Sequence, residues 1–152
     1  MTKIIVFDLD GTIANLDHRR HLVDPTHPAF PGKKDWDEFA RRCIYDTSFE
    51  AVIRILNHLW DDSPWYVQIW TGRFEKYRKD TMEWLAHNHV MYDALRMRPD
   101  GDYTPDHELK EQWLFEVGGA ENILCTFDDR QRVVDMWRRN GVQCFQTADG
   151  NF

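Results

Sequence analysis

The stretch KIIVFDLDGTIA, residues 3–14, determines how the rest of the chain is interpreted. Its first half is an apolar and β-branched run without polar alternation, which predicts a short buried strand over residues 3–9. The run ends in two carboxylates, Asp8 and Asp10, followed by a glycine and a threonine. Burying two carboxylates so close together is costly, so the acids at this strand end indicate a chemical site.

The composition fits one folded domain over residues 1–152, with 42% hydrophobic and 14% aromatic residues. A net charge of −7 argues against a broad basic surface for non-specific nucleic-acid binding. The three cysteines, Cys43, Cys125 and Cys144, lack CxxC spacing, which favours buried thiols in a reducing compartment. Without a signal peptide or an apolar stretch long enough to span a membrane, a cytoplasmic protein is expected.

Further strand-like runs alternate with helical patterns along the chain. Strands are expected at residues 65–70, 94–97, 122–127 and 142–146. Helices are expected near residues 49–60, over the shared apolar face of 74–85, and around 109–114 and 133–137. This alternation predicts an α/β fold, a Rossmann-like three-layer α/β/α arrangement around a parallel sheet.

Residues 15–48 interrupt the alternation with the proline-rich VDPTHPAFPGKK and the helical DWDEFARRC. We interpret them as a small cap inserted after the first strand, and prefer a lid over that strand's carboxyl end to a long loop with one covering helix. The histidines His18, His21 and His27 are irregularly spaced, which favours surface or substrate contacts over a zinc site.

Polar residues stand at three of the predicted strand ends. Asp8 ends the first strand, Thr71 and Gly72 follow the second, and Asp128 and Asp129 follow the strand at 122–127. In open α/β sheets, ligands bind outside the carboxyl ends of the strands, so these residues are expected to meet at one edge.

Four carboxylates, Asp8, Asp10, Asp128 and Asp129, would then lie close together. Like charges at this separation repel strongly at low dielectric, and a hard divalent cation removes the repulsion. Oxygen ligands with room for water and phosphate suit Mg²⁺, so the sequence predicts a Mg²⁺ site formed by these four residues.

The spacing of the first two acids suits phosphoryl transfer. Asp8 is placed to attack phosphorus and form an aspartyl-phosphate. Asp10, two residues later, is placed to protonate the leaving oxygen and then to activate water.

Other residues are candidates for binding the phosphoryl group. Gly11 permits a tight turn whose amides can hold phosphate oxygens. The hydroxyl of Thr71 and the amide of Gly72 can do the same, and Lys110, on a predicted helix, is the candidate for offsetting the remaining negative charge.

The motifs together resemble the haloacid dehalogenase (HAD) superfamily. The matching segments are DLDGT (Asp8 to Thr12), WTGR (70–73), Lys110 and FDDR (127–130), in that order. Dehalogenases of the superfamily lack an acid equivalent to Asp10, so the resemblance implies a phosphatase, with Thr12 among its binding residues. A calcium loop beginning at Asp8 would need an acid where Arg19 stands.

A narrower resemblance covers the second half of the chain. FDDRQRVVDMWRRNGVQCFQTADGNF (127–152), TGRFEKYRKDTMEWL (71–85) and DHELKEQWLF (106–115) are similar to the 3'-phosphatase domain of bacteriophage polynucleotide kinase–phosphatases. The similarity is strong over residues 61–152 and weaker over 15–60. It implies that Arg19, Arg73 and Asp106 also contribute to substrate binding.

Each of these extra residues also has a plainer interpretation. Asp106 and Lys110, four residues apart, would orient one another on a helix, or form an ordinary surface ion pair. Arg19 could bind phosphate, or belong to a solvated HRRH cluster. Asp129 could bind the metal or hold Arg73, and Asp128 is the better placed metal ligand of the two.

The leading functional hypothesis is a Mg²⁺-dependent phosphatase that removes 3'-phosphate from nucleic-acid ends. In the insert, Trp36 and Phe39 are expected either to stack on a base or to cap the hydrophobic core. The alternative is a phosphatase of mononucleotides or other small esters, favoured by the acidic charge and by the absence of a GxxxxGK[ST] kinase motif. A binding module with a relict site is disfavoured, because Asp8 and Asp10 are both present.

Overall fold

The computed structural model describes residues 2–28, 32, 34–62 and 64–150. Five parallel strands form one sheet in the order β5-β4-β1-β6-β7, with β1 at its centre. These strands are β1 (Ile4–Phe7), β4 (Tyr66–Phe74), β5 (Ala94–Arg98), β6 (Ile123–Arg130) and β7 (Cys144–Gly150). All five strands expected from the sequence are therefore confirmed, and so is the parallel sheet.

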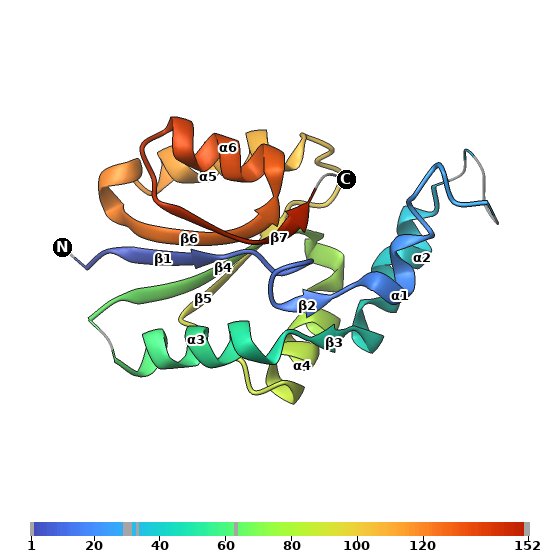
Figure 1. The fold of residues 1–152 in the computed structure, drawn as a ribbon, viewed down its shortest axis with the longest axis horizontal. Helices are drawn as coiled ribbons and strands as arrows, with labels where there is room; N and C mark the ends of the chain where they lie inside the picture. Colours follow the sequence, from blue (N-terminus) through green and yellow to red (C-terminus); the bar gives the residue numbers. More distant parts are fainter. Residues whose placement is uncertain (1, 29–31, 33, 63, 151–152) are drawn as a thin grey trace.

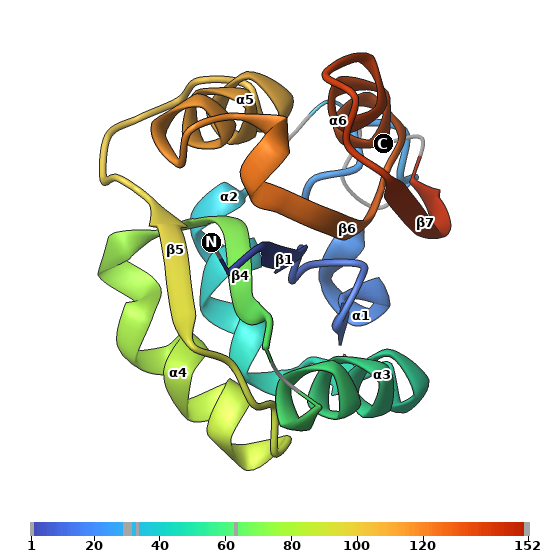
Figure 2. The ribbon, with the colours of Figure 1, turned by 90° about the vertical axis from the view of Figure 1, so that its left-hand side faces the viewer.

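Helices cover both faces of the sheet and make three layers (Figures 1 and 2). One face carries α3 (Glu50–Asp61) and α4 (Arg78–His87), and the other carries α5 (Asp106–Glu116) and α6 (Gln131–Arg139). Short 3₁₀ segments occupy Arg42–Tyr45, Glu75–Tyr77 and Ala120–Asn122. The predicted α/β class is confirmed.

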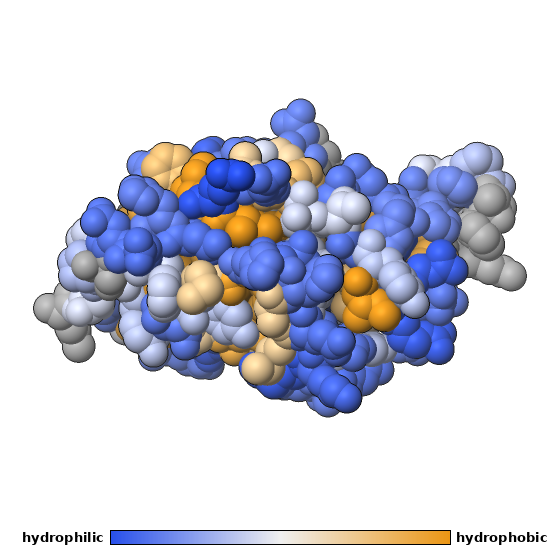
Figure 3. Space-filling view, turned by 90° about the horizontal axis from the view of Figure 1, so that it is seen from below, coloured by the Kyte–Doolittle hydropathy of each residue, from blue (hydrophilic) through white to orange (hydrophobic). Residues whose placement is uncertain are grey.

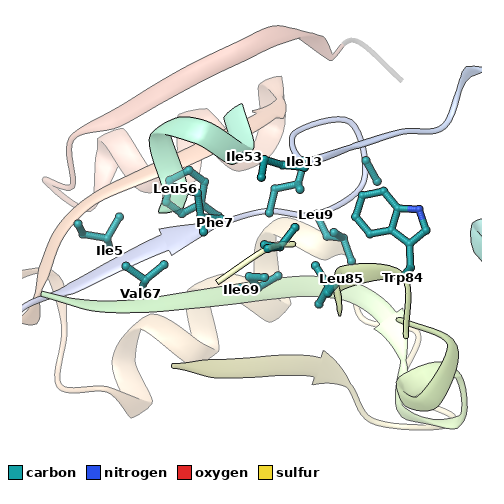
Figure 4. Close-up of a cluster of buried hydrophobic side chains, with 12 residues drawn as sticks. Ile5, Phe7, Leu9, Ile13, Ile53, Leu56, Val67, Ile69, Trp84 and Leu85 are labelled. Carbon is teal, nitrogen blue, oxygen red and sulfur yellow. The ribbon is translucent and has the colours of Figure 1, made fainter. Parts of the chain in front are cut away.

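The central position of β1 in the sheet explains why its sequence is a continuous apolar run. Ile5 and Phe7 point to the layer of α3 and α4, where they pack with Leu56 and Leu85 (Figure 4). Val6 points to the opposite layer. A strand that is buried on both faces needs apolar residues at every position, and each buried side chain stabilises the fold by about 1.5–3 kcal/mol.

The layer of α5 and α6 is built around three tryptophans. The ring of Trp70, on β4, lies 5.8 Å from that of Trp113 and 5.7 Å from that of Trp137. All three rings are buried. The opposite side of the molecule, viewed from below in Figure 3, is mainly hydrophilic with separate apolar patches, as expected where the outer faces of helices meet water.

Four strands run further than their apolar segments predict. The pairing of β4 with β5 extends to Phe74 and Arg98, and that of β6 with β7 extends to Arg130 and Gly150, after an irregularity in each pair. Strand hydrogen bonding therefore continues into the polar motifs. Phe74, expected on a helix, instead ends β4, and α4 begins only at Arg78 after a 3₁₀ turn.

The described residues of the segment 15–48 project from the carboxyl end of the sheet (Figure 1). They hold α1 (Asp17–Arg20) and α2 (Trp36–Arg41), and residues 29–31 and 33 lie outside the described part. A two-stranded antiparallel pair, β2 (Ala14–Asn15) with β3 (Thr47–Ser48), joins the two ends of this segment. Two residues a strand are too few for any sequence pattern, so this pair was not predicted.

The thiols of Cys43 and Cys144 are buried, that of Cys125 is partly buried, and all three are free. Within the described ranges, no helix combines the length and the hydropathy that a membrane span requires.

Candidate active site

The carboxyl end of the sheet brings the predicted strand-end residues together. Asp8 follows β1 directly, Thr71 lies within β4, and Asp128 and Asp129 lie within β6. All four side chains are buried, with residue exposures between 0% and 6%. Because neighbouring parallel strands end at the same edge, their polar ends converge there.

Lys110 reaches this edge from α5 and is only 1% exposed. Its ammonium donates to Asp8 Oδ1 at 2.6 Å and to Asp128 Oδ2 at 2.8 Å, and lies 3.5 Å from Asp106 Oδ2. Burial on its own lowers the pKa of Lys110, but these carboxylates outweigh it and hold the pKa well above its ordinary value. The interpretation of Asp106 and Lys110 as a surface ion pair is therefore wrong.

Three carboxylates, those of Asp8, Asp128 and Asp129, offer oxygen atoms that all lie within 4.8 Å of one another. Burial is the main cause that raises their pKa values, to about 7 for Asp8, about 6 for Asp128 and about 7 for Asp129. Lys110 supplies a single positive charge to this group. A buried excess of hard oxygen donors is what Mg²⁺ requires, so these residues fit that ion.

Gly11 is required beside this carboxylate group. Its φ of +91° is rarely adopted by other residues. A Cβ at this position would lie 2.2 Å from Asp129 Oδ2. The glycine therefore lets the chain after β1 turn directly against the Asp129 carboxylate.

Asp10 lies in a different setting from the other acids. Its carboxylate accepts hydrogen bonds from Arg19 Nη2 at 2.6 Å, and from Arg73 Nη2 at 2.7 Å and Nε at 3.0 Å. Burial on its own raises the pKa of Asp10, but the charges of Arg73 and Arg19 outweigh it and hold the pKa well below its ordinary value. Among the described residues, the group of convergent carboxylates contains Asp8 but not Asp10.

The two arginines are buried: Arg19 is 1% and Arg73 is 7% exposed. The solvated interpretation of the HRRH cluster is therefore wrong for Arg19, whose guanidinium also lies 4.1 Å from the centre of the Phe39 ring. Arg73 is held by Asp10 and Asp46, so its proposed pairing with Asp129 is also wrong.

Asp46 is one site residue that the sequence did not predict. It is 6% exposed and accepts from Arg19 Nε at 2.7 Å, Arg19 Nη2 at 2.6 Å and Arg73 Nη2 at 3.1 Å. His18 Nε2 lies 2.8 Å from Asp46 Oδ1, the same oxygen that accepts from Arg19 Nε. The only available signal was a lone acid in the apolar context CIYDTSF.

The threonines and the second glycine are also close to charged groups. Thr12 Oγ1 donates to Asp129 Oδ1 at 3.5 Å, and Thr71 Oγ1 accepts from the backbone N–H of Arg73 at 3.2 Å. A Cβ on Gly72 would lie 2.7 Å from Asp106 Oδ1. The last of these contacts places Gly72 of β4 against Asp106, the first residue of the helix that carries Lys110.

Arg98, also unpredicted, fixes this junction. Its Nε donates to the carbonyl oxygen of Gly72 at 2.9 Å, and its Nη2 lies 3.6 Å from Asp106 Oδ1. No motif identifies this arginine, which is the last residue of β5.

The two aromatic residues of the cap differ in their surroundings: Phe39 contacts Arg19, whereas Trp36 is 55% exposed.

Comparison with known proteins gives a consistent result. The family model for the phosphatase domain of polynucleotide kinase PNKP matches residues 2–152. A protein of Autographa californica nuclear polyhedrosis virus, named a bifunctional polynucleotide kinase/RNA ligase, is 27% identical over 139 residues. That match covers 90% of this chain and 18% of the viral protein.

Solved structures show the same similarity. A chain in the Pnkp1/Rnl/Hen1 complex superimposes with a TM-score of 0.81 at 30% identity, and the match covers 100% of this chain and 48% of that one. The haloacid dehalogenase-like hydrolase SP0104 of Streptococcus pneumoniae, at 14% identity and a TM-score of 0.62, shares the fold over 95% of this chain and 84% of its own. The chain thus spans less than half the length of the viral relative and of the matched chain in the Pnkp1/Rnl/Hen1 complex.

Proposed function

Because this chain belongs to the PNKP phosphatase-domain family within the haloacid dehalogenase-like hydrolases, we propose that it is a Mg²⁺-dependent polynucleotide 3'-phosphatase. The observation that carries the proposal is the position of Asp8. Its carboxylate lies at the carboxyl end of the central strand, beside two further acids and in contact with a buried lysine. This is the setting of a nucleophile at a phosphate-binding edge.

The proposed reaction has two steps. In the first, an oxygen of Asp8 attacks phosphorus, the bond from phosphorus to the leaving oxygen breaks, and Asp10 donates a proton to that oxygen. In the second, water gives a proton to Asp10 and attacks phosphorus, which releases inorganic phosphate and restores the Asp8 carboxylate. Lys110 offsets negative charge on the transferring group throughout.

The two arginines connect substrate binding to the protonation of Asp10. Without substrate, Arg19 and Arg73 hold Asp10 ionised. A phosphate that bound these guanidinium groups would compete with Asp10 for them, because both are anions. Asp10 would then take up its proton when substrate is bound, which is when the leaving oxygen needs it.

Asp8, Asp128 and Asp129 are the residues proposed to hold Mg²⁺, and Asp10 stays a predicted fourth ligand. A bound Mg²⁺ would neutralise charge on a phosphate oxygen and on the carboxylates around it. Thr71, Gly72 and the turn at Gly11 and Thr12 are the proposed phosphate-binding groups. Asp106 is proposed to orient Lys110.

Two substrate classes fit this site. A nucleic-acid 3'-end is supported by the names of the relatives, which are polynucleotide kinases. Mononucleotides are the second candidate, favoured by the net charge of −7.

Phosphate release in the presence of Mg²⁺ separates these candidates. The substrates are a 3'-phosphorylated oligonucleotide, its 5'-phosphorylated counterpart, and free 3'- and 5'-mononucleotides. We expect the 3'-phosphorylated oligonucleotide to be hydrolysed fastest. Equal or faster hydrolysis of mononucleotides would support the second candidate instead.

The control for this assay is Asp8→Asn, which we expect to abolish turnover because an amide cannot form the acyl-phosphate. Full activity in this variant would exclude the proposed nucleophile.

A further inference from the structure

A second feature of the same sheet edge lies outside the catalytic group. A small hollow is lined by Phe74, Lys76, Asp100, Gly101 and Tyr103. The ring of Tyr103 packs edge-on against that of Phe74, with centroids 5.6 Å apart, yet Tyr103 is 83% exposed. An aromatic ring that is supported on one side and open to solvent on the other is a surface on which a flat group can stack.

The loop that carries Tyr103 is fixed by several hydrogen bonds. The backbone N–H of Lys76 donates to Asp100 Oδ1 at 2.9 Å, and that of Thr104 donates to Asp102 Oδ1 at 2.9 Å. Arg98 Nη1 donates to the carbonyl oxygen of Asp102 at 3.2 Å. The exposed ring is therefore held in place before any ligand arrives, which lowers the entropy cost of binding.

The hollow lies near the proposed phosphate-binding residues of β4. Phe74 follows Gly72 by two residues on the same strand, a separation of roughly 7 Å at 3.3 Å per residue. Arg98 links the two places, because its Nε donates to the Gly72 carbonyl oxygen while its guanidinium lies 5.9 Å from the centre of the Phe74 ring. The loop after β5 also begins at the carboxyl end of the sheet, the end that carries Asp8 (Figure 1).

We propose that the Phe74–Tyr103 surface binds the base of the terminal nucleoside, whose phosphate occupies the site at Asp8. The inference rests on the proposed function and extends it, because it assigns the recognition of a nucleoside to named residues. With a volume of about 50 Å³, the hollow is too small to enclose a base, so the base would stack on the exposed ring rather than enter a pocket.

The charges around the hollow favour a base over a phosphate backbone. Lys76 is the basic side chain of the lining, and its ammonium lies 3.4 Å from Asp37 Oδ1 and 5.8 Å from the Phe74 ring centre. Asp100 lines the same hollow. A strand of phosphates would meet as much negative as positive charge here, whereas a neutral aromatic base stacks without that cost.

The test is a binding measurement that does not depend on turnover. In the Asp8→Asn background, calorimetry gives the Kd of a 3'-phosphorylated oligonucleotide and of the same oligomer ending in a tetrahydrofuran residue that lacks the base. We expect loss of the base to weaken binding about tenfold, the scale of one stacked base. Adding Tyr103→Ala should weaken binding of the intact oligomer by a similar factor and remove the difference between the two ligands.

Two matched variants complete the design. Tyr103→Phe keeps the ring and should keep the tenfold preference. Tyr66→Ala removes another exposed aromatic ring, at the opposite end of β4, and should leave both Kd values unchanged. If Tyr103→Ala leaves the preference for the intact oligomer in place, or if no variant distinguishes the two ligands, the base-binding surface is excluded.

This result is separable from the proposed function. Preference of the wild-type enzyme for mononucleotides over 3'-phosphorylated ends would contradict the 3'-end proposal and leave the stacking result standing. The same calorimetry with a 3'-mononucleotide and the base-free sugar phosphate then measures stacking on the smaller ligand. Loss of the preference for a base in both pairs of ligands would overturn the inference whatever the substrate of the enzyme.

Discussion

Asp46 places two guanidinium groups around Asp10 from a position far away in the sequence. It accepts three hydrogen bonds from Arg19 and Arg73, and these two arginines make three more with Asp10. Because one buried carboxylate binds both buried arginines, its hydrogen bonds fix the position of one guanidinium relative to the other. Removing the carboxylate would also leave buried positive charge without compensation. Asp46 is therefore a positioning residue of the proposed site.

We expect Asp46→Asn to lower kcat/KM roughly tenfold to a hundredfold, because the arginines lose the anion that aligns them. The same variant should weaken competitive inhibition by inorganic phosphate, a readout that a purely structural role would not change. Asp93→Asn is the matched control. Asp93 accepts from the backbone N–H of Val67 at 2.7 Å and from the indole of Trp60 at 3.1 Å, away from the arginines.

The control variant should lower the melting temperature without changing the inhibition constant for phosphate. Equal inhibition constants in the wild type and in Asp46→Asn would show that Asp46 serves only the fold.

The Asp129 carboxylate should destabilise the metal-free protein at alkaline pH. Burial, and then the charge of Asp8, raise its folded pKa from 3.8 to about 7. An acid with a raised folded pKa stabilises the fold fully below pH 3.8, and this contribution is lost as the pH rises through 7. With EDTA at pH 8, Asp129→Asn should therefore raise the melting temperature, by several degrees if about 1 kcal/mol is recovered.

Mg²⁺ should act against this difference in melting temperature. It should raise the melting temperature of the wild type more than that of Asp129→Asn, because the variant lacks one of the proposed ligands. Thermal denaturation with EDTA and with Mg²⁺, at pH 5 and pH 8, checks both statements. An equal response of the two proteins to Mg²⁺ would remove Asp129 from the metal site.

At the scale of elements, α2 differs from the helices that flank the sheet because none of its residues is buried. A few side-chain contacts hold α2 in place. The Phe39 ring packs against the Arg19 guanidinium, and Asp37 accepts hydrogen bonds from Lys76 and Tyr77. Segments with so little buried apolar surface open at low free-energy cost. The insert therefore depends on a few specific contacts.

Amide hydrogen exchange should show this difference. We expect amides of α2 to exchange at least a hundredfold faster than those of β1 and β4, about 2.7 kcal/mol less protection. Phe39→Ala should accelerate exchange in α2 further and leave the sheet unchanged, and Trp36→Ala, which removes an exposed ring from the same helix, should do so less. Protection of α2 equal to that of the sheet would contradict this description.

The sequence predicted the elements of the sheet well because β1 is buried on both faces and reads as one apolar run. It could not predict the pair β2–β3, which is two residues long in each strand, or the extension of β4 and β6 into the polar motifs. Where β4 and β6 end is decided by hydrogen bonds to the neighbouring strands. The sequence of a single strand carries no pattern that reveals this pairing.

Among site residues, those at strand ends and in motifs could be found, and those that act through tertiary contacts could not. Asp8, Asp128 and Lys110 were predicted as neighbours and are hydrogen-bonded. Asp46 and Arg98 come from segments without periodicity or a motif, and only the folded chain shows what they contact.

At the scale of the whole molecule, the net charge of −7 limits how a nucleic acid could be held. If the terminal phosphate and one base make the contacts, few counterions are released on binding. We expect the logarithm of kcat/KM for the 3'-phosphorylated oligonucleotide to fall with the logarithm of salt with a slope of about −1 to −2. A slope of about −4 or steeper would reveal a basic track along the strand, and the 3'-mononucleotide provides the reference slope.

The position of β1 in the sheet also has a consequence for how the chain folds. Ile4 pairs with Tyr66 on one side and with Ile123 on the other, so both neighbours of the central strand are made much later than β1 itself. At roughly 5–20 residues per second of synthesis, the second neighbour leaves the ribosome on the order of ten seconds after the first strand. During that time β1 is an apolar segment with two unpaired edges, so we expect the nascent chain to be prone to aggregation until β4 and β6 have both been made.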